Sequence, residues 1–224
     1  MWSDQQHDPP PMAFFGLRTP EQEAKVAFER QPTDSLNNRF RALLLVPTPA
    51  VLSLDDDLEI PCAQLDFAHG VWQASPRSLV GFAPRLATWD PATGRYRYQS
   101  SFKMVWWHGL YNIVLTKCCF LHRDYLAAYF DALSPDTLAY IDQRRNCEDL
   151  AMQFVVSNAT GGAPPVWVQA GRFTDHGVKI GISQGKDHER ERGACIDRLA
   201  REFGQFPLTL TSHKAVDGRR EWFW

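Results

Sequence analysis

The chain has 224 residues, 44% of them hydrophobic, and its formal net charge at pH 7 is −2. This length and apolar content fit one globular domain with a substantial core. The near-neutral charge, without a sustained basic patch, argues against a nucleic-acid partner. No stretch is long and apolar enough to span a bilayer. Residues 1–11 are polar and proline-rich, which is not the pattern of a signal peptide or an anchor.

The first half of the chain alternates between strand and helix signals. An apolar strand predicted within residues 42–54 ends in three consecutive aspartates, Asp55, Asp56 and Asp57. A turn followed by alternating aromatic residues predicts a hairpin at 90–98. The other predictions here are a short strand at 12–17, a helix at 20–30, a polar connector at 34–40, a helix at 58–74 and a short strand at 79–84.

The second half of the chain has a mixed pattern. We predict a buried strand at 111–120, helices at 123–132, 135–144 and 147–157, a strand at 166–169 and a final helix at 193–203. Residues 174–185 are glycine-rich and are predicted to be mobile. Alternating strands and helices followed by this mixed part predict the α/β class.

The aspartate triplet is the strongest chemical signal. Adjacent carboxylates repel one another, and each raises the pKa of the next unless a cation lies between them. Hard divalent metals prefer such oxygen ligands, and ligands bind at the carboxyl edge of open α/β sheets. The sequence therefore favours a metal that bridges protein and nucleotide diphosphate, with a solvated acidic turn as the alternative. An EF-hand loop starting at Asp55 is excluded because its sixth position is Ile60 instead of glycine.

Two further polar clusters lie near helix starts in the C-terminal half. Asn146 fits an N-cap, and Asp149 fits the third position of a capping box. Charges alternate over residues 187–192, which is most often a solvated helix face. However, His188 and Arg192 are four residues apart and share a face if the segment is helical. Capping, a solvated face and an active site all remain open for these residues.

A set of short stretches stands in one order along the chain. They are LNNRF at 36–40, AVLSLDDD at 50–57, VWQ at 71–73, LVGFAPR at 79–85, WD at 89–90, YNIVLT at 111–116, NCEDLAMQF at 146–154, the segment 192–195 and FPL at 206–208. This set resembles the exostosin-type glycosyltransferases, glycosyltransferase family 64, over most of the chain from about residue 36 to residue 208. The ordered set is far more specific than any single motif.

The resemblance implies a GT-A fold, an α/β fold with a mixed central sheet, in which residues 1–224 form a single glycosyltransferase domain. It implies UDP-sugar donors, usually UDP-N-acetylglucosamine or UDP-N-acetylgalactosamine, and a glycan or glycolipid acceptor. The implied metal is manganese (Mn2+), and transfer retains the α configuration. The implied location is the Golgi or endoplasmic reticulum lumen, reached through a membrane anchor expected in the full-length parent.

The resemblance also assigns donor-binding residues by position. Asp57 resembles the family's direct metal ligand. Asp55 and Asp56 resemble contacts to the ribose, the sugar or the metal shell. Arg39 resembles the family's donor-binding arginine, and His188 occupies the place of a histidine near the diphosphate.

The reacting groups are assigned in the same way. Asp149 resembles the carboxylate on the reacting face of the sugar, and Arg192 resembles the arginine that grips the diphosphate. Cys147 and Cys195 resemble the family's disulfide, which would hold their Cα atoms within roughly 4.4–6.8 Å. It would thereby place Asp149 close to Arg192 and His188. An ionised carboxylate there would stabilise an oxocarbenium-like transition state, either as a covalent nucleophile or in front-face departure.

The chain departs from the family pattern at its start. The family's first strand-helix unit, which helps to hold uridine, has no counterpart here, so we expect an N-terminally incomplete fold. This departure favours an alternative in which the chain is a non-catalytic or truncated glycosyltransferase-like subunit acting as a binding or complex partner. A homo- or hetero-oligomer is compatible with both interpretations. The intact aspartates, with Asp149 and Arg192, favour the enzyme.

Overall fold

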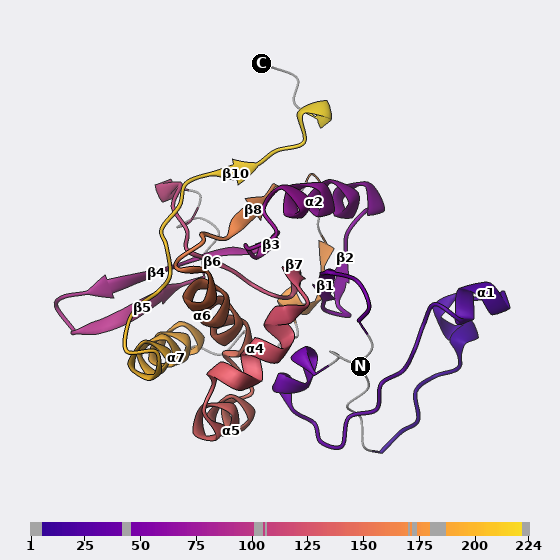
Figure 1. Ribbon diagram of the computed structural model, residues 1–224, viewed down its shortest axis with the longest axis horizontal. Coiled ribbons are helices and arrows are strands. Elements are labelled where there is room, and N and C mark those ends of the chain that lie inside the picture. The colour runs from indigo at the N-terminus through magenta and orange to yellow at the C-terminus, as the bar shows by residue number, and fades with distance from the viewer. Residues whose placement is uncertain are drawn as a thin grey trace.

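The computed structural model describes residues 6–41, 46–100, 105, 107–169, 171, 174–179 and 187–220. A mixed central sheet lies between helices, which confirms the predicted α/β class (Figure 1). The strand order is β1 (Ala50–Leu54), β7 (Cys118–His122), β3 (Val80–Gly81), β8 (Val166–Val168) and β10 (Lys214–Ala215). β7 runs antiparallel to β1 and to β3, whereas β3, β8 and β10 are parallel.

The two faces of the sheet carry separate hydrophobic clusters because successive side chains of a strand point to opposite faces. On β7, Cys119 and Leu121 join the cluster that includes α4 (Asp124–Ala132) and α6 (Glu148–Thr160). Cys118 and Phe120 join the opposite cluster, which α2 (Cys62–Ala74) covers with Ala68 and Trp72. Burying a large apolar side chain contributes about 1.5–3 kcal/mol, so this alternation fixes which face each helix covers.

Helix α6 lies inside the protein. Every residue from Asp149 to Ser157 is buried, and α6 packs against α4, β6 (Ile113–Val114) and α7 (His188–Glu202). α7 in turn packs on the hairpin of β4 (Pro84–Asp90) and β5 (Arg95–Gln99). The contact is close at Gly193, where a Cβ atom would lie 2.8 Å from the Tyr96 carbonyl oxygen. The first turns of α6 and α7 are therefore held by well-packed elements.

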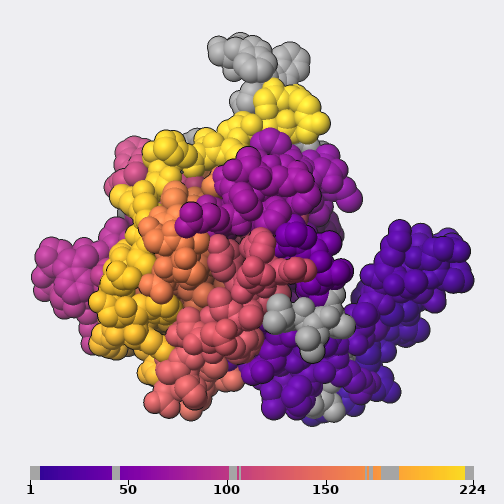
Figure 2. All heavy atoms as spheres, in the orientation of Figure 1, coloured from indigo at the N-terminus to yellow at the C-terminus, as the bar shows by residue number. Residues whose placement is uncertain are grey.

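Smaller elements complete the described part of the chain. β6 (Ile113–Val114) extends the hairpin, and β2 (Leu58–Glu59) pairs with β9 (Thr174–Asp175). The others are η1 (Met12–Phe15), α1 (Pro20–Glu23), η2 (Leu36–Phe40), α5 (Pro135–Arg144), η4 (His176–Lys179) and η6 (Gly218–Arg220). In Figure 2 the N-terminal segment and the hairpin project from opposite sides of the body. None of the described helices is long and apolar enough to cross a membrane.

The hairpin, α4, α5, α6 and β8 confirm the sequence-based predictions, and α7 begins earlier than predicted. The strand at 12–17 is wrong, because the structure has the 3-10 helix η1 there. The helix at 20–30 is also wrong in extent. Only α1 is helical, it buries no residue, and so short a helix gains little without packing.

Two predicted elements, the strand at 111–120 and the helix at 58–74, have the wrong extent because contacts with distant segments of the chain decide where strands form. The strand at 111–120 is two strands, because a turn at Thr116 and Lys117 carries the chain from β6 beside the hairpin to β7 in the central sheet. The helix at 58–74 starts only at Cys62, after Pro61, because residues 58–59 pair with β9. Within 42–54 the structure describes β1, and residues 42–45 lie outside the described part. Of the segment 174–185 predicted to be mobile, residues 174–179 form β9 and η4, and the rest lies outside it.

Candidate active site

A cleft of about 630 Å³ opens beside the carboxyl end of β1 and the first turns of α6 and α7. Among the described residues, acids and bases line it in equal numbers. The basic residues are Arg39, Arg85, Lys117, Arg145 and Arg192, and the acidic residues are Asp55, Asp57, Glu148, Asp149 and Asp175. The cleft thus brings the end of a strand together with the starts of two helices, as an active site in an α/β sheet would require.

A buried ion pair forms one wall of the cleft. Arg192 Nη2 donates to Asp149 Oδ1 at 2.6 Å, and the two side chains are only 6% and 9% exposed. Arg192 Nη1 donates to Asn146 Oδ1 at 3.0 Å, and the guanidinium lies 4.6 Å from the ring centre of Tyr98. Burial is the largest single influence and would raise the pKa of Asp149, but the charge and hydrogen bond of Arg192, the Leu150 N–H and the charge of Arg39 together lower that pKa below its usual value. Asp149 is therefore ionised at neutral pH.

A disulfide sets the distance between the helices that carry this pair. Cys147 and Cys195 are joined with their Cα atoms 6.2 Å apart. Cys147 immediately precedes α6, and its φ of 85° lies in the left-handed region. Arg192 stands one turn before Cys195 on α7. The disulfide thus ties the start of α6 to α7 where Arg192 meets Asp149.

Capping does not explain the polar residues at the start of α6. The N-cap position is Cys147, and no side chain caps it. The Asn146 side chain instead accepts from Arg192. Asp149 Oδ1 accepts from Arg192 and from the backbone N–H of Leu150 at 2.7 Å. The capping interpretation is therefore wrong, because the side chains of Asn146 and Asp149 accept hydrogen bonds from Arg192 and line the cleft.

A second charged group lies across the cleft. Arg39 forms an ion pair with Asp55, donates from Nη1 to Thr116 Oγ1 at 3.3 Å, and places Nη1 3.8 Å from Glu148 Oε1. Burial raises the pKa of Asp55 although Arg39 opposes that shift. Burial, followed by the charge of Asp149, raises the pKa of Glu148 to about 7. Arg39 therefore connects the aspartate triplet to the start of α6.

Asp57 lies at the cleft against the segment that follows β9. Its backbone oxygen accepts from the His176 N–H at 2.9 Å. Gly177 sits so close that a Cβ atom there would lie 2.0 Å from Asp57 Oδ2. Asp175 holds this segment by an ion pair with Lys117 and by accepting from the Gly177 N–H at 3.1 Å. The position of the Asp57 carboxylate thus depends on a glycine far away in the sequence.

Asp57 fits a ligand of a shared metal ion. Its Oδ1 atom is buried and has no hydrogen-bond partner in the described part of the chain. Within the same residues, no group of three or more His, Cys, Asp or Glu side chains is arranged to hold an ion. An ion at Asp57 would therefore take further oxygens from a bound ligand, as divalent ions held by one carboxylate and substrate phosphates do.

The remaining predicted donor-binding residues lie in different places. His188 lines the cleft, where burial, followed by the charge of Arg192, lowers the pKa of its imidazole. Asp56 is exposed and lines a neighbouring hollow of about 600 Å³, whose wall also includes Arg39, Asp55 and Asp57. All the predicted polar site residues therefore line the cleft except Asp56, which lines the neighbouring hollow.

Sequence reasoning missed Glu148, Tyr98, Gly177 and the pair of Lys117 with Asp175. Glu148 is adjacent to Asp149. Because neighbouring residues of a helix point about 100° apart, two consecutive acids are not expected to line the same cleft. A lone tyrosine on a hairpin and a glycine in a loop carry no signal of their own. Only the acid at 148, next to a candidate active-site acid, could have been suspected.

Comparison with known proteins identifies the class. The glycosyl transferase family 64 domain matches residues 1–219. The chain is 41% identical over 204 residues to Glycosylinositol phosphorylceramide mannosyl transferase 1 of Arabidopsis thaliana, covering 90% of this chain and 60% of that protein. It is 31% identical over 218 residues to Exostosin-2 of Homo sapiens, covering 96% of this chain and 29% of that protein.

A third relative is Exostosin-1 of Drosophila melanogaster, 34% identical over 174 residues, which cover 78% of this chain and 22% of that protein. The chain thus spans 60% or less of these relatives. These matches define the chain's class as a glycosyltransferase-family domain. The chain belongs to glycosyltransferase family 64.

Replacing both Cys147 and Cys195 by alanine is expected to lower the free energy of unfolding by about 4 kcal/mol on the chain-entropy model. The reason is that the disulfide closes a loop with a sequence separation of 48. Urea denaturation without reductant measures the effect. Cys62→Ala, at an exposed free cysteine, is the control and should change stability by less than about 0.5 kcal/mol. A double variant as stable as the unmodified protein would contradict the structural role of the disulfide.

Proposed function

We propose that this chain has a GT-A fold and transfers N-acetylhexosamine from a UDP-sugar to a glycan or glycolipid acceptor, with manganese and with retention of the α configuration. The observation that carries the proposal is the buried pair of Arg192 and Asp149 in a cleft that also contains Asp57. An ionised carboxylate, a fixed guanidinium and a carboxylate with a free oxygen are the groups that such a transfer uses.

Arg192 is suited to the leaving group. Transfer breaks the bond between the anomeric carbon and a phosphate oxygen, and the electron pair stays on the diphosphate. Arg192 Nε is buried and has no partner among the described residues. One N–H donor of the guanidinium group is therefore left for a phosphate oxygen. Arginine matches phosphate geometry, and a preorganised donor stabilises charge that develops there.

Asp149 is suited to the sugar. As the bond to the diphosphate breaks, positive charge builds up at the anomeric carbon, and a carboxylate below the ring stabilises it. Arg192 lowers the pKa of Asp149 and holds its carboxylate in one orientation. The acceptor hydroxyl forms the new bond to the anomeric carbon, and its proton leaves with the departing diphosphate.

Asp57 would hold the manganese together with the donor phosphates. When bound, the ion supplies positive charge that stabilises the departing diphosphate. Among the described residues that line the cleft, acids and bases are equal in number, so these residues supply no surplus of positive charge for a diphosphate. The charge of a sugar diphosphate would then be compensated by the divalent ion instead of by surplus arginines.

A second candidate is mannosyl transfer. It is favoured by the 41% identity to a protein named as a glycosylinositol phosphorylceramide mannosyl transferase. Incubation with UDP-N-acetylglucosamine, UDP-N-acetylgalactosamine and GDP-mannose in parallel separates the two. We also propose the Golgi or endoplasmic reticulum lumen as the location, with a membrane anchor in the full-length parent, because the disulfide is typical of oxidising compartments.

Asp149→Asn is expected to slow sugar transfer by at least about a hundredfold while the dissociation constant for UDP stays nearly unchanged. The variant removes the negative charge below the sugar but keeps an oxygen acceptor for Arg192. Transfer is measured by chromatography of the glycan product, and UDP binding by calorimetry. Asp131→Asn, at an exposed residue of α4, is the matched control. Normal transfer by a folded Asp149→Asn protein would remove Asp149 from the mechanism.

Gly177→Ala is expected to weaken manganese-dependent UDP binding by at least about tenfold, because the added methyl group displaces the Asp57 carboxylate. Binding with chelator present should not change. Gly70→Ala is the matched control, since Gly70 lies in α2 and a Cβ atom there would meet nothing within 4 Å. Calorimetric titration with UDP measures both. If Gly177→Ala binds UDP and manganese as the parent does, Asp57 is not the metal ligand.

A further inference from the structure

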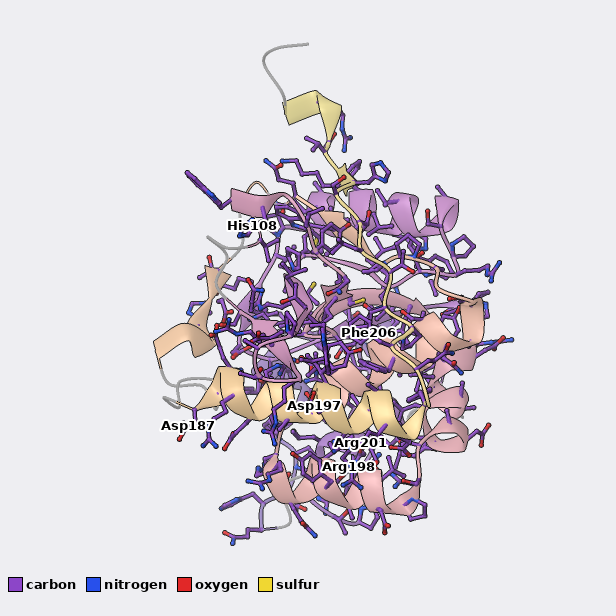
Figure 3. The ribbon with its side chains drawn as sticks, turned by 90° about the vertical axis from the view of Figure 1, so that its left-hand side faces the viewer. His108, Asp187, Asp197, Arg198, Arg201 and Phe206 are labelled. Atoms are coloured by element: carbon purple, nitrogen blue, oxygen red, sulfur yellow. A yellow bond between two sulfur atoms is a disulfide. The ribbon has the colours of Figure 1, made fainter. Side chains whose placement is uncertain are left out.

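Another hollow lies away from the cleft, between the β4–β5 hairpin and the C-terminal half of α7. Its volume is about 340 Å³, and its wall includes Trp89, Tyr96, Asp197, Arg201 and Phe206. We call it the hairpin hollow. Figure 3 views the molecule from this side, with Asp197 and Arg201 on α7 and Phe206 on the segment that follows it.

Three aromatic rings support one another in the hairpin hollow. The rings of Tyr96 and Phe206 are stacked with their centroids 4.5 Å apart. Trp89 packs on Tyr96 at 5.0 Å in an edge-on arrangement and remains 55% exposed. Because Trp89 and Tyr96 are direct cross-strand partners, the pleat of the hairpin fixes their relation. The result is a rigid indole that is held from one side and open on another.

Polar groups surround this exposed indole. Asp197 Oδ1 accepts from the Tyr96 N–H at 2.8 Å, and Oδ2 lies 4.0 Å from Arg95 Nε. The exposed side chain of Arg201 comes from the next turn of α7. A sugar ring has an apolar C–H face and a rim of hydroxyl groups, so it fits an aromatic surface beside carboxylate and guanidinium groups. A purely apolar partner would leave these polar groups unpaired, which costs binding energy.

The hairpin hollow lies on the same hairpin and the same helix as the wall of the candidate active site. A further hollow of about 430 Å³ is lined by Tyr98, which also lines the cleft, and by Trp89, which also lines the hairpin hollow. On α7, Asp197 and Arg201 follow Arg192 by about 8 and about 14 Å at the rise of an α-helix. That separation equals the length of a few sugar rings, so a glycan of several units is long enough to extend from the cleft to Trp89.

We propose that the hairpin hollow binds a sugar ring of the acceptor glycan several units away from the reacting end, with Trp89 as the stacking surface. This inference rests on the proposed function for the identity of the ligand as acceptor. It makes Trp89 a specificity-determining residue for acceptor length, outside the groups that carry out transfer.

The test is calorimetric binding, to the full chain without donor, of oligosaccharides of two and six sugars in which glucuronic acid alternates with N-acetylglucosamine. We expect the hexasaccharide to bind at least about tenfold more tightly than the disaccharide. Trp89→Ala should abolish that difference and leave manganese-dependent UDP binding unchanged. Trp107→Ala is the matched control, since Trp107 is 81% exposed and lines none of the three hollows; it should bind both oligosaccharides as the parent does.

Two results would overturn the inference. One is Trp89→Ala binding the hexasaccharide with the affinity of the parent protein. The other is a parent protein that sediments as a dimer and becomes monomeric on Trp89→Ala, because the hairpin hollow would then be an interface between copies. Hexasaccharide binding that depends on Trp89 in a protein that does not bind UDP would support the hollow and reject the proposed function, so the two failures are distinguishable.

Discussion

The buried ion pair of Arg192 and Asp149 is the interaction on which the rest of the site depends. Each charge is almost fully removed from water, and removing one partner of such a pair costs about 3–5 kcal/mol because the other charge stays buried. The residues around this pair hold it in position. The disulfide fixes the distance between α6 and α7, Asn146 occupies a second nitrogen of Arg192, and Tyr98 covers its face.

The same constraint explains the opposite wall of the cleft. Burying Glu148 next to Asp149 raises the pKa of Glu148, and Arg39 offsets part of that cost while it also pairs with Asp55. Three cations of the cleft are each fixed by an acid, Arg39 by Asp55, Lys117 by Asp175 and Arg192 by Asp149. Among the described residues that line the cleft, Asp57 Oδ1, Arg85 Nε and Arg192 Nε are buried polar atoms without a partner. A ligand that carries both a cation and phosphates would satisfy the carboxylate and an arginine.

The sequence could predict the α/β class and the elements that depend on local signals. The hairpin is specified by its turn and alternating aromatics, and α5 by Ser134 and Pro135 at its start. It could also predict that the aspartate triplet follows a strand and that Asp149 lies in the first turn of a helix, whereas Arg192 falls outside the helix predicted at 193–203. It could not predict that residues 58–59 pair with β9, or that Gly177 touches Asp57, because these contacts join segments more than a hundred residues apart. Spacing rules act within a helix or strand and carry no information on such approaches.

The central claim is that the cleft binds a nucleoside diphosphate through Asp57, a divalent ion and Arg192. The most direct measurement is a crystal structure of the chain with UDP and manganese, with the ion located by its anomalous scattering. The account predicts that the ion contacts the Asp57 carboxylate and the diphosphate, and that Arg192 donates to a diphosphate oxygen. An ion bound away from Asp57, or a diphosphate outside the cleft, would contradict it.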